Sequence, residues 1–404
     1  MFRSVHCKIV SVGLLVASVI GGTLVTSVAM AGPSQAATKT HGAPVLVSML
    51  ADINAPAEGF NFQEAITGAN AAVVAVNKAG GIHGHPLKLI ICDGQGNPNT
   101  ETACANTAVS DGTVATVGDA DFIDPTAPIL QPAGIAEIMD NPASPVELQS
   151  PVSFPVNGSA FLGLFGELLL AKDYIHATKI SVIANGPSAS TLEANAKMAA
   201  TGMGMSVVNS ITLTGNETDL TPTVEAAAAN GAQAFVLLLP PDNAASVISA
   251  MKQNDISAPP DTIALTPAQV KALGSAANGI FEVDYFPPIS LGLPGTKLYV
   301  KQLTAYDKNA VLDTTSAIPW LAVHMFANVA NSLPTVTRAS VLKAMVDAKD
   351  LNTYGLIPPY SSSPPFTGLG GAFPRAFNQT FWFDEIKNGK TLAVVKHAVN
   401  VVGG

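Results

Sequence analysis

Few residues of this chain could do covalent or metal chemistry, and two cysteines are the clearest candidates. Cys92 ends an apolar run of strand length, and Cys104 lies about two turns into the helix expected after it. A helix packed back on its own strand can bring two such Cα atoms within disulfide range, and an exported protein meets an oxidising compartment. We therefore predict a Cys92–Cys104 disulfide. The alternatives are two buried free thiols or a metal pair, although no His or third Cys lies at ligand spacing.

Patterns typical of catalysis are missing from the sequence. It has no G-x-S-x-G nucleophile elbow, no phosphate-binding loop and no paired-carboxylate motif. The glycines at 80, 81 and 84 follow a helix instead of joining a strand to a helix, so they form no dinucleotide fingerprint. Three histidines are isolated from any nucleophile: His176, His324 and His397. We therefore do not expect an enzyme, and we predict no catalytic residue, cofactor or metal.

The segment over residues 65–118 predicts the elements that must position a site. Apolar residues recur at helical spacing over 66–76, and Gly80-Gly81 then ends the helix. A strand follows over 87–92, and Asn97-Pro98 begins the next helix with a capping side chain and a first-turn proline. A second buried strand follows over 114–117. Strands that alternate with helices indicate a parallel, doubly wound sheet, whose binding sites lie at the carboxyl ends of the strands.

The amino terminus has the parts of a secretory signal. Arg3 and Lys8 precede an apolar, charge-free run over 9–31 that ends in small residues, and a second cleavage position lies after 36 or 37. We assign residues 1–37 to a signal peptide and expect an exported protein of the periplasm or the extracellular or cell-wall space. A membrane anchor is the alternative, because the run is long enough to span a bilayer. Helix-poor residues such as Gly21-Gly22 favour cleavage.

Composition restricts the partners. The formal net charge is −9, only 12% of residues are charged, and the basic residues form no cluster. Nucleic acid is therefore not an expected partner. About 370 residues remain after the signal, which is enough for two lobes that each bury a core.

One stretch resembles a known family. The run NKAGGIHGHPLKLIICDGQGNP is similar to the amino-terminal half of type I periplasmic binding proteins, the leucine/isoleucine/valine-binding receptors of ABC transporters. In that family a GGI-x-G turn precedes the second strand and D-x-x-x-x-P follows it. Softer likenesses recur at 276–280, at 318–322 and over 381–395. The resemblance implies an α/β fold of two doubly wound parallel-sheet lobes joined by a hinge.

We divide the chain into lobes from this resemblance and from the order of its elements. Lobe 1 is expected to comprise residues 43–153 and 278–355, and lobe 2 residues 154–277 and 375–404. A Pro/Ser/Gly-rich loop over 356–374 crosses between them, and the strand over 279–285 is expected to return to lobe 1. A closing hairpin should turn at Asn388-Gly389.

The resemblance also implies where a ligand binds. In the family, loops after the third and fourth strands hold an amino acid, and an aromatic wall precedes the first helix. Tyr285 is a further candidate, in place of an aromatic contact that the second lobe otherwise lacks. The corresponding residues are Phe60, Phe62, Asp119, Ala120, Asp121, Phe122, Asn141, Ala143, Ser144, Asn185, Pro241 and Tyr285.

This chain departs from the family in the first of those loops. Asp119 and Asp121 replace a serine-rich stretch, and either acid would repel a carboxylate ligand unless it points away or is protonated. A cationic, amide or neutral polar ligand is therefore credible beside an amino acid. The acids could instead cap the helix that follows, and the aromatics could pack against a helix start.

The implied function is an exported solute receptor that closes over a small polar ligand and delivers it to an ABC permease of the inner or cytoplasmic membrane. We expect a monomer. One alternative is a ligand sensor on the same fold that signals to a membrane receptor. A secreted hydrolase is a further alternative, which would need a clustered nucleophile and base.

Overall fold

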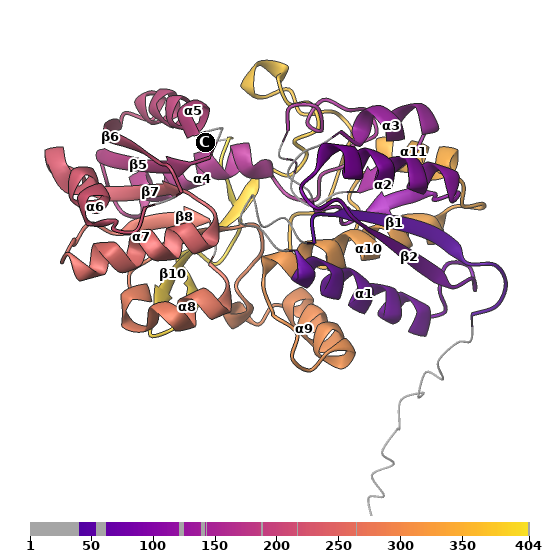
Figure 1. The fold of residues 1–404 in the computed structure, drawn as a ribbon. Coiled ribbons are helices and arrows are strands. Elements are labelled where there is room, and N and C mark those ends of the chain that lie inside the picture. The colour runs from indigo at the N-terminus through magenta and orange to yellow at the C-terminus, as the bar shows by residue number, and fades with distance from the viewer. Residues whose placement is uncertain are drawn as a thin grey trace, which may run out of the picture. The chain divides into compact units, whose positions relative to one another are not determined.

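The computed structural model describes residues 40–53, 62–120, 125–138, 142, 144–186, 189–215, 217–263 and 265–402. The expected signal peptide, residues 1–37, lies outside these ranges. The described chain forms two α/β lobes, each built on its own sheet (Figure 1). Over the same ranges, each helix is too short or too polar to cross a bilayer.

The first lobe is built on a four-stranded parallel sheet. Its spatial order is β2 (Leu87–Asp93), β1 (Val45–Ala51), β3 (Ala115–Val117) and β4 (Ala136–Ile138). Six helices belong to this lobe among the described residues: α1 (Gln63–Lys78), α2 (Pro98–Ser110), α3 (Ala127–Ala133), α9 (Pro294–Tyr306), α10 (Thr314–Ser332) and α11 (Arg338–Val346). Helix α1 packs along α10 and α9, and α2 packs beside α3.

Local sequence explains where these helices begin and end. Gly80 and Gly81 have positive φ, and the Gly81 amide donates to the Val76 carbonyl, which satisfies a carbonyl at the end of α1. Asn97 caps α2 by accepting from the amides of Asn99 and Thr100, with Pro98 in the first turn. The expected end of the first helix at 80–81 and the expected start of the second at 97–98 are confirmed.

The second lobe is built on a mixed sheet. Strands β6 (Ser206–Leu213), β5 (Lys179–Asn185), β7 (Ala234–Leu238), β8 (Pro260–Ile263) and β9 (Phe281–Asp284) are parallel neighbours in that order. The antiparallel hairpin of β10 (Thr380–Lys387) and β11 (Lys390–Ala393) continues the sheet, and β12 (Val399–Asn400) pairs with β10. Five helices complete the lobe within the described ranges: α4 (Ser159–Asp173), α5 (Ala189–Gly202), α6 (Thr221–Ala228), α7 (Pro241–Gln253) and α8 (Pro267–Leu273).

The assignment of one strand to the first lobe is wrong. Strand β9 pairs in parallel with β8 and antiparallel with β10, so it lies inside the second sheet. Strand β8, which is short and contains Pro260 and Asp261, was not predicted, and it provides the edge on which β9 pairs. The chain therefore crosses to the first lobe after Asp284, and not before residue 278 as expected. The hairpin turn at Asn388-Gly389 is confirmed.

The core of the first lobe runs along α10. Trp320 and Phe326 are fully buried in it. Helix α1 approaches the start of α10 at Gly68, where an added Cβ would lie 1.9 Å from the carbonyl oxygen of Ser316. This close backbone approach requires glycine at position 68.

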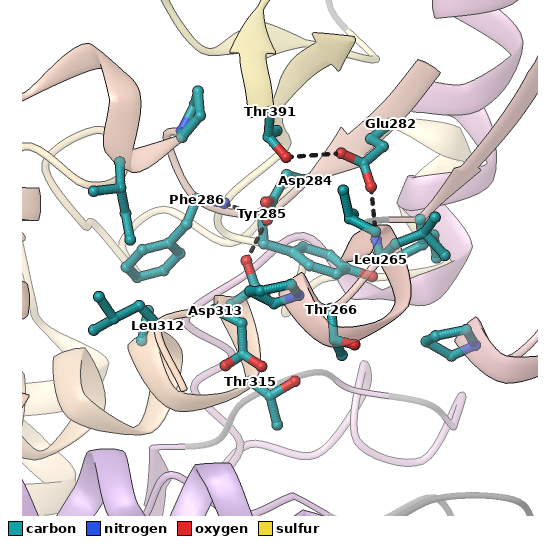
Figure 2. A pocket seen from close by; sticks show the side chains of 18 of the residues that line it. Leu265, Thr266, Glu282, Asp284, Tyr285, Phe286, Leu312, Asp313, Thr315 and Thr391 are labelled. Atoms are coloured by element: carbon teal, nitrogen blue, oxygen red, sulfur yellow. Dashed lines mark hydrogen bonds between the residues drawn. The ribbon is translucent and has the colours of Figure 1, made fainter. Parts of the chain in front are cut away.

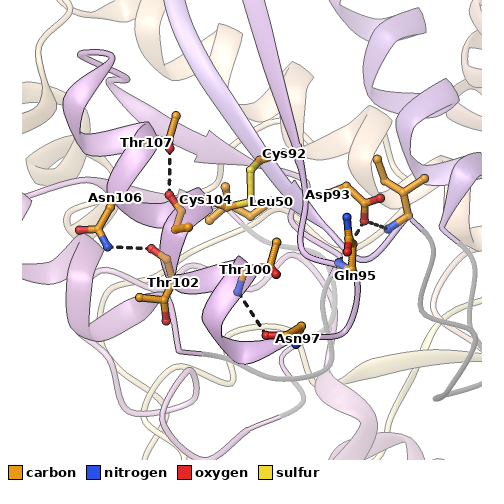
Figure 3. Close-up of a disulfide and its surroundings, with 12 residues drawn as sticks. Leu50, Cys92, Asp93, Gln95, Asn97, Thr100, Thr102, Cys104, Asn106 and Thr107 are labelled. Carbon is orange, nitrogen blue, oxygen red and sulfur yellow. Dashed lines mark hydrogen bonds between the residues drawn. A yellow bond between two sulfur atoms is a disulfide. The ribbon is translucent and has the colours of Figure 1, made fainter.

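The predicted disulfide is confirmed. Cys92 in β2 and Cys104 in α2 are bonded, with their Cα atoms 5.6 Å apart (Figure 3). Cys104 is buried beside Leu50 of β1 and Leu130 of α3. The bond therefore fastens α2 to the sheet it covers, within the first lobe.

Candidate binding cavity

A cavity of about 1260 Å³ opens where the carboxyl ends of the parallel strands meet. Its lining includes Ala120 after β3, Asn185 at the end of β5, Leu239 after β7 and Ile263 at the end of β8. The strand β9 contributes Glu282 and Asp284. The cavity thus lies where the sequence analysis placed a site for a doubly wound sheet.

The first lobe contributes an aromatic and polar wall. Phe62 lies immediately before α1, and Tyr299 lies on α9. The Tyr299 hydroxyl lies 2.5 Å from the Ser316 hydroxyl and donates to the Asp313 carbonyl at 3.2 Å. Burial raises the pKa of Tyr299, so the phenol stays neutral at physiological pH. Asp313 itself caps α10, because its Oδ1 accepts from the Ser316 amide at 3.0 Å.

The second lobe places two carboxyl groups in the wall from one face of β9. Glu282 Oε1 accepts from the Leu265 amide at 2.7 Å, and its Oε2 accepts from the Thr391 hydroxyl at 3.4 Å (Figure 2). Asp284 Oδ1 accepts from the Phe286 amide at 3.1 Å and from the Thr314 hydroxyl. The Asp284–Thr314 hydrogen bond joins the last residue of β9, in the second lobe, to the first residue of α10, in the first lobe.

Burial dominates the electrostatics of this wall. Desolvation raises the pKa of Glu282 to about 8, and the amide of Leu265 only partly offsets this rise. The pKa of Asp284 rises to about 6 for the same reason, and so does that of Asp313. At neutral pH Glu282 is therefore mostly an uncharged carboxylic acid, which can donate a hydrogen bond as well as accept one.

Three further carboxyl groups are buried in the second lobe, and one of them lines the cavity. Glu167 of α4 is the lining residue; Asp261 of β8 and Asp384 of β10 are not. Burial raises the pKa of Glu167 and of Asp261 well above the ordinary range, and raises that of Asp384 to about 9. Within the described ranges, no group of three or more His, Cys, Asp or Glu side chains is arranged so that it could hold a metal ion.

Five of the residues predicted to bind ligand line this cavity. They are Phe62, Ala120, Asn185, Pro241 and Tyr285. Asp119 is buried, and its Oδ1 accepts from the Leu50 amide of β1 at 2.7 Å. Ser144 forms a local turn with Glu147, whose carboxylate accepts from the Ser144 amide at 2.7 Å. Phe60, Asp121, Phe122, Asn141 and Ala143 lie outside the described residues. The binding role of all these residues stays a prediction.

Most residues of the second-lobe wall were not predicted from the sequence. Thr266 caps α8 in a reciprocal arrangement with Gln269, whose side chain also donates to Asp242 Oδ1 of α7 at 2.7 Å. The Thr-x-x-Gln spacing is a capping signal that could have revealed this helix start. Glu167, Glu282 and Asp284 carry no such signal, because an acid in a helix or strand usually faces solvent.

Two α/β lobes with a cavity at their strand ends define a ligand-binding protein. Residues 44–373 match the family model described as Periplasmic binding protein, and the chain belongs to that family. Membership confirms both the fold class and the solute-binding function that the sequence indicates. The family consists of binding proteins rather than enzymes. A comparison with curated protein sequences gives no match.

Solved structures agree on the fold. The leucine-binding protein LivK of Thermotoga maritima is 13% identical, with a TM-score of 0.70, and the match covers 88% of this chain and 99% of that one. LivJ of Streptococcus pneumoniae, solved with isoleucine, is 15% identical with a TM-score of 0.69 over 88% and 99%. A fatty acid ABC transporter substrate-binding protein of Thermomonospora curvata is 16% identical, with a TM-score of 0.68 over 91% and 96%.

Proposed function

We propose that the protein is an exported receptor that closes over a small ligand in this cavity and delivers it to an ABC permease. The observation that carries the proposal is the cavity itself, whose lining comes from the strand ends of both lobes. A ligand held there would contact both lobes at once, so it would stabilise the arrangement in which they approach each other.

The ligand class is an amino acid, an amide or a related compound with a polar group and an apolar body. Apolar side chains such as Leu239, Ile263 and Phe286 supply most of the wall, and carboxyl and hydroxyl groups supply polar contacts. Two similar structures suggest the range of ligands: LivJ is solved with isoleucine, and the Thermomonospora protein is a fatty acid ABC transporter substrate-binding protein. The predicted residues Phe62, Asn185 and Tyr285 are proposed as ligand contacts.

Export and partners complete the proposal. A signal peptide over residues 1–37 would direct the chain out of the cytoplasm, and the partner would be a permease in the inner or cytoplasmic membrane. The receptor would act as a monomer.

A thermal-shift screen tests the proposal. Amino acids, amides, amines, alcohols and aliphatic or aromatic acids are each added to the protein without residues 1–37. A ligand that binds only the native state raises the melting temperature, by an amount that grows with its concentration over Kd. A shift confirmed by calorimetry at one site per chain supports the proposal. Failure of all these classes to bind would contradict it.

A further inference from the structure

The cavity lining is acidic in its interior and basic only where it meets solvent. Four carboxyl groups line it: Glu167 from α4, Glu282 and Asp284 from β9, and Asp313 before α10. Its basic residues are Lys271 and Lys390, and both are exposed. The lysine ammonium groups can therefore remain hydrated. Among the lining side chains that can carry a charge near neutral pH, those in the interior are all carboxyl groups.

Glu167 is the carboxyl group in this lining that most lacks a partner. It is 0% exposed, and neither of its oxygen atoms makes a hydrogen bond within the described residues. The backbone amide of Ile263 lowers its pKa, which offsets only part of the rise that burial causes. A buried carboxyl group left in this state costs free energy, which a donor on a bound molecule could recover.

The surroundings of Glu167 define what kind of molecule could reach it. Leu164 lies one helical turn before it on α4, and Leu238 and Ile263 lie at neighbouring strand ends; all three line the cavity. Asp261 on β8 is a further acid near Glu167, and repulsion from Glu167 and from Glu282 raises its pKa. A carboxylate ligand would meet acids and leucines, whereas an ammonium group on an apolar body would meet a matching partner.

We propose that the ligand is an apolar molecule that carries an ammonium group, and that this group pairs with the carboxyl group of Glu167. This inference rests on the proposed receptor function and names the ligand class within it. Asp284 and Asp313, whose pKa values rise only to about 6, are mostly ionised at neutral pH and make the rest of the cavity unfavourable for anions. The pairing requires Glu167 to ionise, so a proton leaves the protein when the ligand binds.

The test compares three probes of one length: hexylamine, hexan-1-ol and hexanoate. Calorimetry at about pH 7, in two buffers of different ionisation enthalpy, gives the affinity and the number of protons released. We expect hexylamine to bind at least about ten-fold more tightly than hexan-1-ol, with release of close to one proton, because its charge pairs with a buried carboxylate. Equal or tighter binding of hexan-1-ol or hexanoate would overturn the inference.

A matched pair of variants assigns the effect to Glu167. Glu167→Gln keeps the side-chain size and removes the charge, so the preference for hexylamine and the proton release should both disappear. Asp384→Asn is the control, because Asp384 is also buried without a hydrogen bond in the second lobe but does not line the cavity. It should keep both properties. An unchanged preference in Glu167→Gln would refute the pairing.

The outcome also separates this inference from the receptor function. If hexylamine does not bind but another solute of the screen does, the inference fails and the receptor function stands. If no solute of any class binds, both fail.

Discussion

At the scale of single residues, the second lobe contains carboxyl groups that water does not reach. Asp261, Glu282 and Asp384 lie on three adjacent strands, and Asp384 is directly opposite Glu282 in the sheet. Burial raises the pKa of all three, and repulsion from nearby carboxyl groups raises it further. With pKa values of about 8 and 9, Glu282 and Asp384 hold their protons near neutral pH in the folded state. The unfolded chain would lose those protons at its ordinary pKa.

This difference predicts that the folded protein is less stable in alkaline solution. Between the ordinary pKa near 4 and the raised values of about 8 and 9, the folded state binds more protons than the unfolded state. The free energy of unfolding should therefore fall as the pH rises, by roughly 1 kcal/mol per pH unit for each such proton. Thermal denaturation between about pH 6.5 and pH 9 measures this slope.

The measurement begins at about pH 6.5 because His324 has the opposite effect on stability at lower pH. Burial lowers the pKa of His324 to about 4, so this residue makes stability rise with pH up to the ordinary histidine value of 6.5. Asp384→Asn should flatten the alkaline slope, because it removes one of the buried protons. A melting temperature that stays constant or rises over this range in the unsubstituted protein would contradict the prediction.

At the scale of elements, the contact of α1 with α10 makes a sharp prediction. In Gly68→Ala the new methyl group would overlap the Ser316 carbonyl, so the helices would have to separate. Forced overpacking costs about 1–3 kcal/mol. Chemical denaturation of the variant should show a loss of at least this size.

Gly202→Ala is the matched control for this substitution. Gly202 is the last residue of α5, its φ is ordinary, and an added Cβ would meet nothing within 4 Å. The control should be neutral or more stable by up to about 1 kcal/mol, because alanine restricts the unfolded chain. Equal stability of the two variants would show that α1 and α10 do not approach each other as described.

The sequence predicted elements well where it marks their ends. Gly80-Gly81 ends a helix, Asn97-Pro98 begins one and Asn388-Gly389 forms a hairpin turn, each by local backbone chemistry, and all three are as expected. Strand β8 was missed because Pro260-Asp261-Thr262-Ile263 is short and half polar, so only its neighbours in the sheet make it a strand. Without β8, the position of β9 could not be deduced.

The candidate site was predictable only in part for a related reason. Asn185 and Pro241 follow recognisable strands, so they could be placed at the cavity from the order of elements alone. Glu167 sits in the middle of α4, and Glu282 sits inside β9. Their burial depends on how α4 and the hairpin β10–β11 cover the sheet, which a local pattern of residues does not contain.

At the scale of the whole molecule, the described chain passes between the lobes three times: between β4 and α4, after Asp284, and between α11 and β10. One arginine links the first of these crossings to the third. The Arg375 guanidinium lies 4.5 Å from the ring centre of Phe154 and 4.6 Å from that of Phe377, and its Nε donates to the Ser153 carbonyl at 2.7 Å. These contacts fasten the third crossing to the first. The segment after Asp284 is the remaining crossing, next to the cavity.

This arrangement predicts that the lobes move as rigid bodies when a ligand binds. Small-angle scattering should give a smaller radius of gyration at a saturating concentration of a solute identified by thermal shift. A solute that gives no thermal shift, added at the same concentration, is the control. Identical scattering curves with and without the binding solute would count against closure.

The Cys92–Cys104 bond has a consequence for the life of the protein in the cell. Both cysteines belong to the first lobe, so the crosslink leaves the movement between lobes free. It forms only where thiols are oxidised, so a copy still in the cytoplasm would carry two thiols and an exported copy would carry none at these positions. The disulfide-bonded form is lighter by two hydrogens than the form with two thiols. The mass of the peptides that carry Cys92 and Cys104 would thus show which molecules have crossed the membrane.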